Sequence, residues 1–133
     1  MRKLAMREKL FEYAAERFGA KPEYLWSRNP QHGVLRRSDN DKWFAVIMNV
    51  DGSKVGLEKG ISVDIVNVKC SPLMTGSLLG MKGIVPAYHM NKENWISVLL
   101  DGSVEEKQIM SLLDMSYELA GQSGKRLRTV PKD

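Results

Sequence analysis

Apolar and polar side chains alternate with two different periods along the chain, and the longer period marks helices. Near both ends, apolar residues recur three and four positions apart, which places them on one face of a helix. A short third helix is predicted after Ser71-Pro72, a side-chain cap followed by a proline in the first turn. Ser103 and Glu106 have the spacing of a capping box before the last helix. A glycine follows each run and marks the expected end of its helix. The predicted helices are 2–18, 72–79 and 104–120.

The shorter period, an alternation of two, marks β-strands in the middle of the chain. Turn-forming residues separate these runs, and both the tetrapeptide 38–41 and Asp51-Gly52 are typical of tight turns. After the second turn, the segment 54–57 is expected to pair back onto the preceding strand. The predicted strands are 33–37, 42–50, 62–70, 84–90 and 95–100.

The order of these elements predicts one α+β domain. Strands joined by short turns must run antiparallel, and amphipathic helices need a sheet face against which to bury their apolar stripes. We therefore predict a two-layer α/β sandwich, with one antiparallel sheet of about five strands and helices packed on one face. Residues 1–121 form this domain. The remaining residues, 122–133, form a basic tail that is expected to be mobile.

The composition adds a mild positive charge and few special features. Twenty Lys and Arg against sixteen Asp and Glu give a net charge of +4, which is compatible with a nucleic-acid partner without requiring one. The single cysteine, Cys70, excludes an intramolecular disulfide and a cysteine-rich metal site, and it favours a reducing cytoplasm. The N-terminus does not resemble a secretory signal, and no apolar run approaches the ~20 residues of a membrane helix. We expect a cytoplasmic monomer without membrane contact.

Strand alternation divides the side chains between a helix-covered face and an open face of the sheet. In the strands 62–70 and 95–100, alternation places Lys69 and Trp95 on the open face. If Phe44, Val46 and Met48 point inward, the neighbours that share the open face are Trp43, Ala45, Ile47 and Asn49. Aromatic rings beside cations suit stacked bases and phosphates. The alternative is that the tryptophans are half-buried and only stabilise the sheet.

The polar turn at 88–92 carries one of the two histidines. As a catalytic base, His89 would need a carboxylate and a nucleophile, and only Glu93 and Asp101 are acids close to it in sequence. His89 and His32 make a poor metal site, because no third ligand has suitable spacing. We expect His89 and Asn91 to fix the turn through bonds from side chain to backbone, or to recognise a ligand. The sequence therefore predicts no catalytic residue, no metal and no cofactor, and the protein is not expected to be an enzyme.

The run Pro86-Ala87-Tyr88-His89-Met90-Asn91-Lys92, followed by Trp95 and by Ser116-Tyr117, resembles the MmcQ/YjbR family of small bacterial proteins. The likeness extends from the first helix to Leu119 and leaves out the basic tail. It implies a fold like that of frataxin/CyaY and of secretion chaperones. It also implies a DNA-binding role through a double wing of β-hairpins.

The leading hypothesis is a non-catalytic module that binds nucleic acid. The candidate residues are Arg36, Arg37, Lys42, Trp43, Lys69, His89, Asn91, Lys92 and Trp95. The alternative is a protein-interaction or chaperone-like module that binds a peptide on the open sheet face. Iron handling of the frataxin type is disfavoured, because it needs clustered carboxylates, whereas the first helix interleaves Glu with Lys and Arg.

Overall fold

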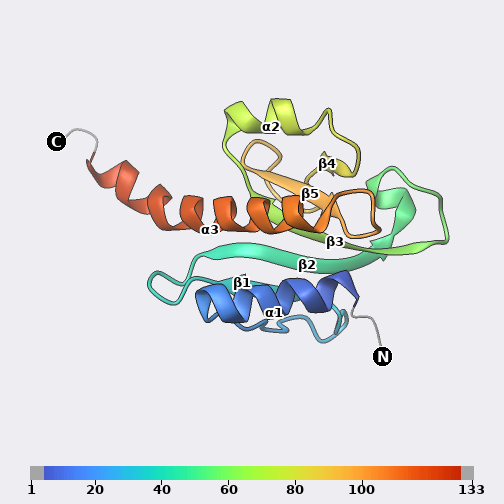
Figure 1. Ribbon diagram of the computed structural model, residues 1–133, viewed down its shortest axis with the longest axis horizontal. Helices are drawn as coiled ribbons and strands as arrows, with labels where there is room; N and C mark the ends of the chain where they lie inside the picture. Colours follow the sequence, from blue (N-terminus) through green and yellow to red (C-terminus); the bar gives the residue numbers. More distant parts are fainter. Residues whose placement is uncertain (1–4, 130–133) are drawn as a thin grey trace.

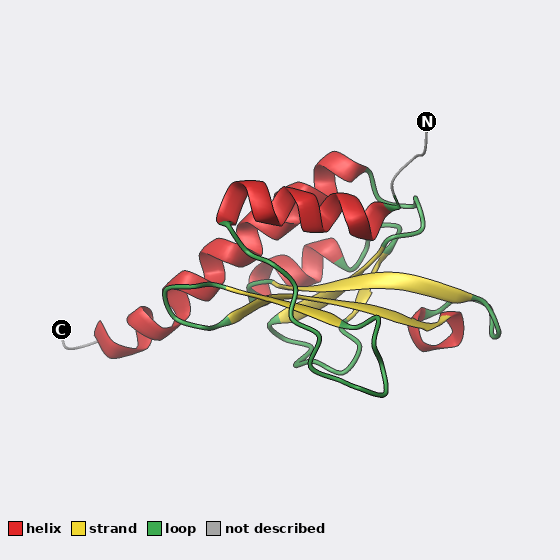
Figure 2. Ribbon diagram, turned by 90° about the horizontal axis from the view of Figure 1, so that it is seen from below, coloured by secondary structure: helices red, strands yellow, loops and turns green. Residues whose placement is uncertain are grey.

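The computed structural model describes residues 5–129, with side chains through Gly121. Within these residues, three α-helices lie on one face of a five-stranded antiparallel sheet of order β1-β2-β3-β5-β4 (Figures 1 and 2). The predicted two-layer α+β fold is confirmed. The helices are α1 (Met6–Phe18), α2 (Pro72–Leu78) and α3 (Glu106–Thr129). The strands are β1 (Gly33–Arg36), β2 (Trp43–Asp51), β3 (Ser62–Lys69), β4 (Ile84–Pro86) and β5 (Trp95–Leu99).

The segment predicted to pair back after the second turn is a 3-10 helix instead. This helix, η1 (Gly52–Val55), is capped by the Asp51 side chain, which accepts a hydrogen bond from the backbone N–H of Ser53. Gly52 lies so near the backbone of Glu58 that an added Cβ would be 2.6 Å from its carbonyl oxygen. The cap and this close approach hold the chain in a compact loop, so it cannot extend as a strand.

The last helix begins and ends later than predicted. Ser103 does not cap it, because the Ser103 hydroxyl donates to the carboxylate of Asp101, and α3 begins at Glu106. The helix then continues past Gly121 to Thr129. The side chains of the predicted basic tail, residues 122–133, lie outside the described residues, and its mobility stays a prediction.

An aromatic cluster beneath the helices joins α1 and α3 to the sheet. Phe18 stacks on Tyr117 with ring centroids 4.0 Å apart, and Phe44 meets both rings edge-on. The guanidinium group of Arg37 lies 4.1 Å from the centroid of the Tyr117 ring and donates to the Tyr117 carbonyl oxygen at 2.8 Å. A Cβ at Gly121 would lie 2.6 Å from Nη1 of Arg37. Gly121 therefore makes room for this guanidinium group, which holds the turn between β1 and β2 against α3.

A β-bulge interrupts the pairing of β1 with β2. Leu35 pairs with Ala45, but the next residue, Arg36, pairs with Trp43. Phe44 is therefore one extra residue on β2, and both Phe44 and Ala45 join the core beneath the helices. A bulge of this kind shifts the side chains that follow it to the opposite face.

The bulge explains why the predicted faces of β2 are wrong. Ala45 and Ile47, predicted for the open face, pack beneath the helices. Val46 and Met48, predicted to point toward the helices, lie on the second face of the sheet. Trp43, which precedes the bulge, keeps its predicted place on that second face.

The polar groups beside the bulge are satisfied from α3. Ser116 is fully buried, and its hydroxyl donates to the carbonyl oxygen of Phe44 at 2.6 Å. The same hydroxyl accepts a hydrogen bond from the backbone N–H of Lys69 at 2.7 Å. Because an interrupted ladder leaves such backbone groups without a strand partner, one serine on a helix joins β2 to β3 at this point.

The second face of the sheet is not open, contrary to the prediction. Val46, Ile65 and Leu99 are only 2%, 0% and 4% exposed. No α-helix among the described residues covers this side; loops and η1 lie over it instead (Figure 2). A ligand on this side must therefore use the surface that the loops leave accessible.

Candidate functional site

Between these loops the second face is hollowed into a cavity of about 570 Å³. The strand β2 gives it an apolar lining of Val46, Met48 and Val50. Its aromatic and imidazole side chains come from three segments, and they are Trp26, Trp43, Tyr88, His32 and His89. Small-molecule pockets have volumes of about 300–1,000 Å³ and combine apolar walls with a few polar groups. This cavity is therefore the candidate site.

The first wall combines β2 with the loop between α1 and β1. The rings of Trp26 and Trp43 meet edge to face with centroids 6.0 Å apart, and His32 meets Trp26 in the same way at 6.1 Å. The Nε2 atom of His32 lies 3.3 Å from the carbonyl oxygen of Asn49. Because a carbonyl oxygen only accepts, Nε2 is the donor in this contact. Both tryptophans are half-buried.

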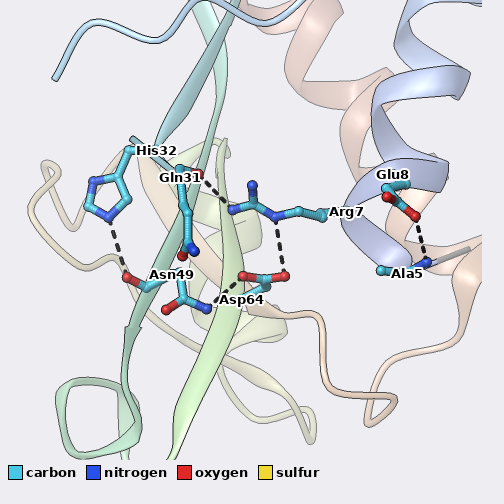
Figure 3. Close-up of polar contacts among 7 residues, drawn as sticks. All are labelled: Ala5, Arg7, Glu8, Gln31, His32, Asn49 and Asp64. Carbon is cyan, nitrogen blue, oxygen red and sulfur yellow. Dashed lines mark hydrogen bonds and ion pairs between the residues drawn. The ribbon is translucent and has the colours of Figure 1, made fainter. Parts of the chain in front are cut away.

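Helix α1 holds this wall from the other side of the sheet (Figure 3). Arg7 pairs with the carboxylate of Asp64 at 3.2 Å and donates to the carbonyl oxygen of Gln31 at 2.7 Å. The Asp64 carboxylate also accepts from the side chain of Asn49 at 2.9 Å. Arg7 thus ties β3 to the loop that carries His32, and Asn49 links both to β2.

Two buried polar side chains of the sheet anchor the second wall. The amide of Asn67 donates to the carbonyl oxygen of Tyr88 at 2.9 Å, and the hydroxyl of Ser97 accepts from the Tyr88 N–H at 2.9 Å. Asn67 and Ser97 also bond to each other, and both are 0% exposed. The chain leaves β4 at Pro86, and these bonds place the Tyr88 backbone over the sheet instead of extending the strand to residue 90 as predicted.

The turn that follows is held by Asn91, as predicted. The Asn91 side-chain oxygen accepts from the backbone N–H groups of Glu93 and Asn94 at 2.8 and 3.2 Å. His89 has a positive φ of 62°, a strained conformation for a residue with a side chain, and its ring lies 4.0 Å from that of Tyr88. Among the described residues its ring makes no hydrogen bond, so its predicted bond to the backbone is not found, and the ring is exposed at the cavity.

Lysines flank the cavity, and the carboxylate of its acidic residue, Asp51, is hydrogen-bonded within its own loop. The Asp51 carboxylate accepts from the Ser53 hydroxyl at 2.5 Å and from the N–H groups of Ser53 and Gly60 at 3.0 and 2.8 Å. These bonds, that of the hydroxyl first, lower the pKa of Asp51 below its usual value. Lys54 lines the cavity, and Lys92 lines an adjoining hollow. The ammonium groups of Lys54 and Lys92 form no ion pair within the described part of the chain.

Four predicted site residues serve the fold instead of lining the cavity. Arg36 pairs with Glu23 at 3.1 Å, and Arg37 pairs with Asp39 at 2.7 Å while it packs on α3. Trp95 is 7% exposed and lies beneath the ammonium group of Lys69, 4.9 Å from the centroid of one of its rings. Burial of Lys69, followed by the nearby charge of Lys42, lowers the pKa of Lys69.

The structure thus brings together part of the predicted site. Trp43 and His89 line the cavity and Lys92 lies beside it, whereas the predicted patch of Trp43 and Trp95 on a bare sheet does not form. The sequence reasoning missed Trp26, His32, Tyr88 and Lys54 as lining residues. Tyr88 could have been predicted from the sequence, because it belongs to the run that carries the family resemblance.

The described residues contain neither a metal-binding cluster nor a membrane-spanning helix. No group of three or more His, Cys, Asp or Glu side chains among them has the arrangement of a metal site. Within residues 5–129, no helix combines the length and the apolar character needed to cross a bilayer.

Fold and cavity together define a small α+β domain with a pocket on the loop-covered face of its sheet. The sequence matches the YjbR family over residues 16–119, and the chain belongs to this family. The protein YyaQ of Bacillus subtilis is 39% identical over 113 residues, which are 85% of this chain and 96% of YyaQ. The protein YjbR of Escherichia coli K12 is 33% identical over 86 residues, 63% of this chain and 73% of YjbR.

Solved structures share the fold. A crystal structure of a protein from Pseudomonas syringae superposes with a TM-score of 0.83 at 42% identity, and the match covers 86% of this chain and 97% of that one. A crystal structure of a protein from Deinococcus radiodurans has a TM-score of 0.69 at 20% identity, covering 89% of this chain and 80% of that one. The second likeness concerns the fold alone. The expected likeness to frataxin/CyaY stays a prediction.

Proposed function

We propose that the protein is a non-catalytic module that binds single-stranded nucleic acid, with one unstacked base in the cavity of the second face. The observation that carries the proposal is the meeting of three aromatic rings, those of Trp26, Trp43 and Tyr88, around one cavity. Aromatic side chains bind single strands by stacking on bases, because every base has a π-face. The cavity volume, about 570 Å³, suits a base with its sugar.

The charges around the cavity support a polyanion more than a neutral ligand. The net charge is +4, and Lys54 and Lys92, which line the cavity or the hollow beside it, form no ion pair in the part of the chain that the structure describes. The same holds for Lys42, which precedes Trp43 in the chain. Arg36 and Arg37 already bind carboxylates, so the hairpin that carries them is a poor phosphate-binding wing. The proposal therefore favours a single strand at the cavity over a duplex held by the hairpin.

A second candidate is a protein partner that inserts an apolar side chain into the same cavity. Met48 and Met90 favour it, because flexible thioethers adapt to side chains of different shape. A peptide laid across the strands is not compatible with the covered second face. The affinity for a protein partner would be nearly independent of salt, whereas the affinity for a nucleic-acid strand would fall as salt rises, because the strand releases counterions on binding.

Titration of labelled random oligonucleotides at two salt concentrations tests the proposal. If Lys42, Lys54 and Lys92 together neutralise two or three phosphates of the strand, log K should fall against log salt with a slope of about −1.5 to −2 on single strands. Trp43→Ala should weaken this binding by about 1–3 kcal/mol, the value of one stacked base. The matched control is Tyr24→Ala, an aromatic side chain that is 53% exposed and outside the cavity. Equal affinities of the two variants would refute a base in the cavity.

A further inference from the structure

A second hollow, of about 260 Å³, lies directly beside the aromatic cavity. The two share Lys54 and Tyr88 in their linings, so both residues adjoin the cavity and the hollow. The smaller hollow is built differently: it contains no tryptophan and no histidine, and its polar side chains are those of Lys54, Tyr88 and Lys92. Of the described residues that line it, none is acidic.

Lys92 reaches this hollow in a fixed position. Its ammonium group donates to the carbonyl oxygen of Ala87 at 2.7 Å, five residues earlier in the same turn. An ammonium group has three donors, so two remain for a ligand. The turn itself is fixed by Asn91 and by the bonds of Asn67 and Ser97 to the Tyr88 backbone. Lys92 is thus preorganised, which lowers the entropy lost when a ligand binds.

Lys54 approaches the hollow from the opposite loop. It lies in η1, whose N-terminal cap is the Asp51 carboxylate with its three bonds to the loop. Lys54 and Lys92 line this hollow from two different loops, and an anion between them would be attracted by both charges. A phosphate group supplies the negative charge and the acceptor oxygens that both lysines can bind.

We propose that this hollow is a phosphate subsite, so that the unit recognised is one nucleotide: the base in the aromatic cavity and its phosphate between Lys54 and Lys92. The inference rests on the proposed function for the placement of the base. It adds that recognition is complete within a single nucleotide, with Tyr88 beside both base and phosphate. Adjoining nucleotides of a strand then add affinity without setting the register.

Binding of adenosine and of adenosine monophosphate, followed by quenching of tryptophan fluorescence, tests the subsite. The monophosphate should bind about tenfold more tightly than adenosine, the factor expected from one charge-assisted hydrogen bond. In the Lys54→Ala/Lys92→Ala double variant the two ligands should bind equally. The matched control is Lys82→Ala, an exposed lysine outside both hollows, which should keep the tenfold preference. Thermal unfolding of each variant checks that it is folded.

The outcomes separate the subsite from the base-binding proposal. Equal binding of adenosine and its monophosphate to the unsubstituted protein overturns the subsite and leaves the base in the cavity. Inorganic phosphate that binds as tightly as the monophosphate also overturns it, because the base then contributes nothing. The subsite is also overturned if oligonucleotide binding depends on Trp43 but not on Lys54 or Lys92. If neither adenosine, its monophosphate nor a single strand binds, the proposed function itself fails.

Discussion

Replacing Ser116 by alanine should destabilise the protein far more than the loss of one small hydroxyl suggests. That hydroxyl is the partner of two backbone groups, the carbonyl of Phe44 and the N–H of Lys69, at a site where Ser116 is fully buried. A buried polar group without a partner costs about 1–3 kcal/mol, and alanine returns roughly 0.5 kcal/mol of helix propensity. Two such groups lose their partner, so we expect Ser116→Ala to lower the free energy of unfolding by about 1.5–5.5 kcal/mol.

Urea denaturation followed by circular dichroism measures this loss. With an m-value of about 1.5–2 kcal/mol per molar, the midpoint should fall by about 1–3.5 M while m stays unchanged. Ser111→Ala is the matched control, because Ser111 lies on the same helix and is exposed; its change should stay within about 0.5 kcal/mol. Amide exchange at Lys69 should also accelerate. A midpoint for Ser116→Ala equal to that of Ser111→Ala would refute the role given to this hydroxyl.

The remaining predictions concern the loops that wall the cavity. The bonds to Asp51 lower its pKa below the usual value of about 3.9, so its stabilisation is present at neutral pH and is lost as the pH falls below about 4. Thermal unfolding of Asp51→Asn should therefore vary less with pH than that of the unsubstituted protein between about pH 4 and 2; equal variation would contradict this. Arg7→Met keeps the apolar stem but removes the ion pair with Asp64 and the hydrogen bond to Gln31, so we expect a loss of about 1–2 kcal/mol and faster exchange of the His32 amide. Lys9→Met, which breaks a more exposed pair, should cost under about 1 kcal/mol, and equal losses would argue against Arg7 as the support of the loop.

Periodicity predicted the layers of this fold correctly, because helices and strands have different hydrophobic repeats and short turns force antiparallel pairing. It failed within β2. One extra residue, Phe44, makes Ala45 and Ile47 face the helices, and it moves Val46 and Met48 into the cavity. The sequence gives no local signal for this bulge, since the run from 43 to 50 is apolar at nearly every position. The partner that makes the bulge possible, Ser116, lies 72 residues away from Phe44.

The candidate site was only half predictable for a related reason. Trp43 and His89 could be singled out from the sequence as residue types that suit recognition, but their neighbours depend on how loops fold over the sheet. Tertiary contacts also decide which cations remain accessible. Arg37 is committed to α3 and to Asp39, and nothing in its sequence neighbourhood indicates the contact with Tyr117, 80 residues later.

The division of the sheet into a helix-covered face and a loop-covered face has a consequence for sequence variation among relatives. Along β2, the side chain of Ile47 packs beneath the helices, whereas those of Val46 and Met48 line the cavity and would contact a ligand there. Neighbouring positions on one strand are therefore expected to be under different constraints. Relatives with different ligands should diverge at every second residue of this strand and keep the positions between, so that a change of specificity leaves folding intact.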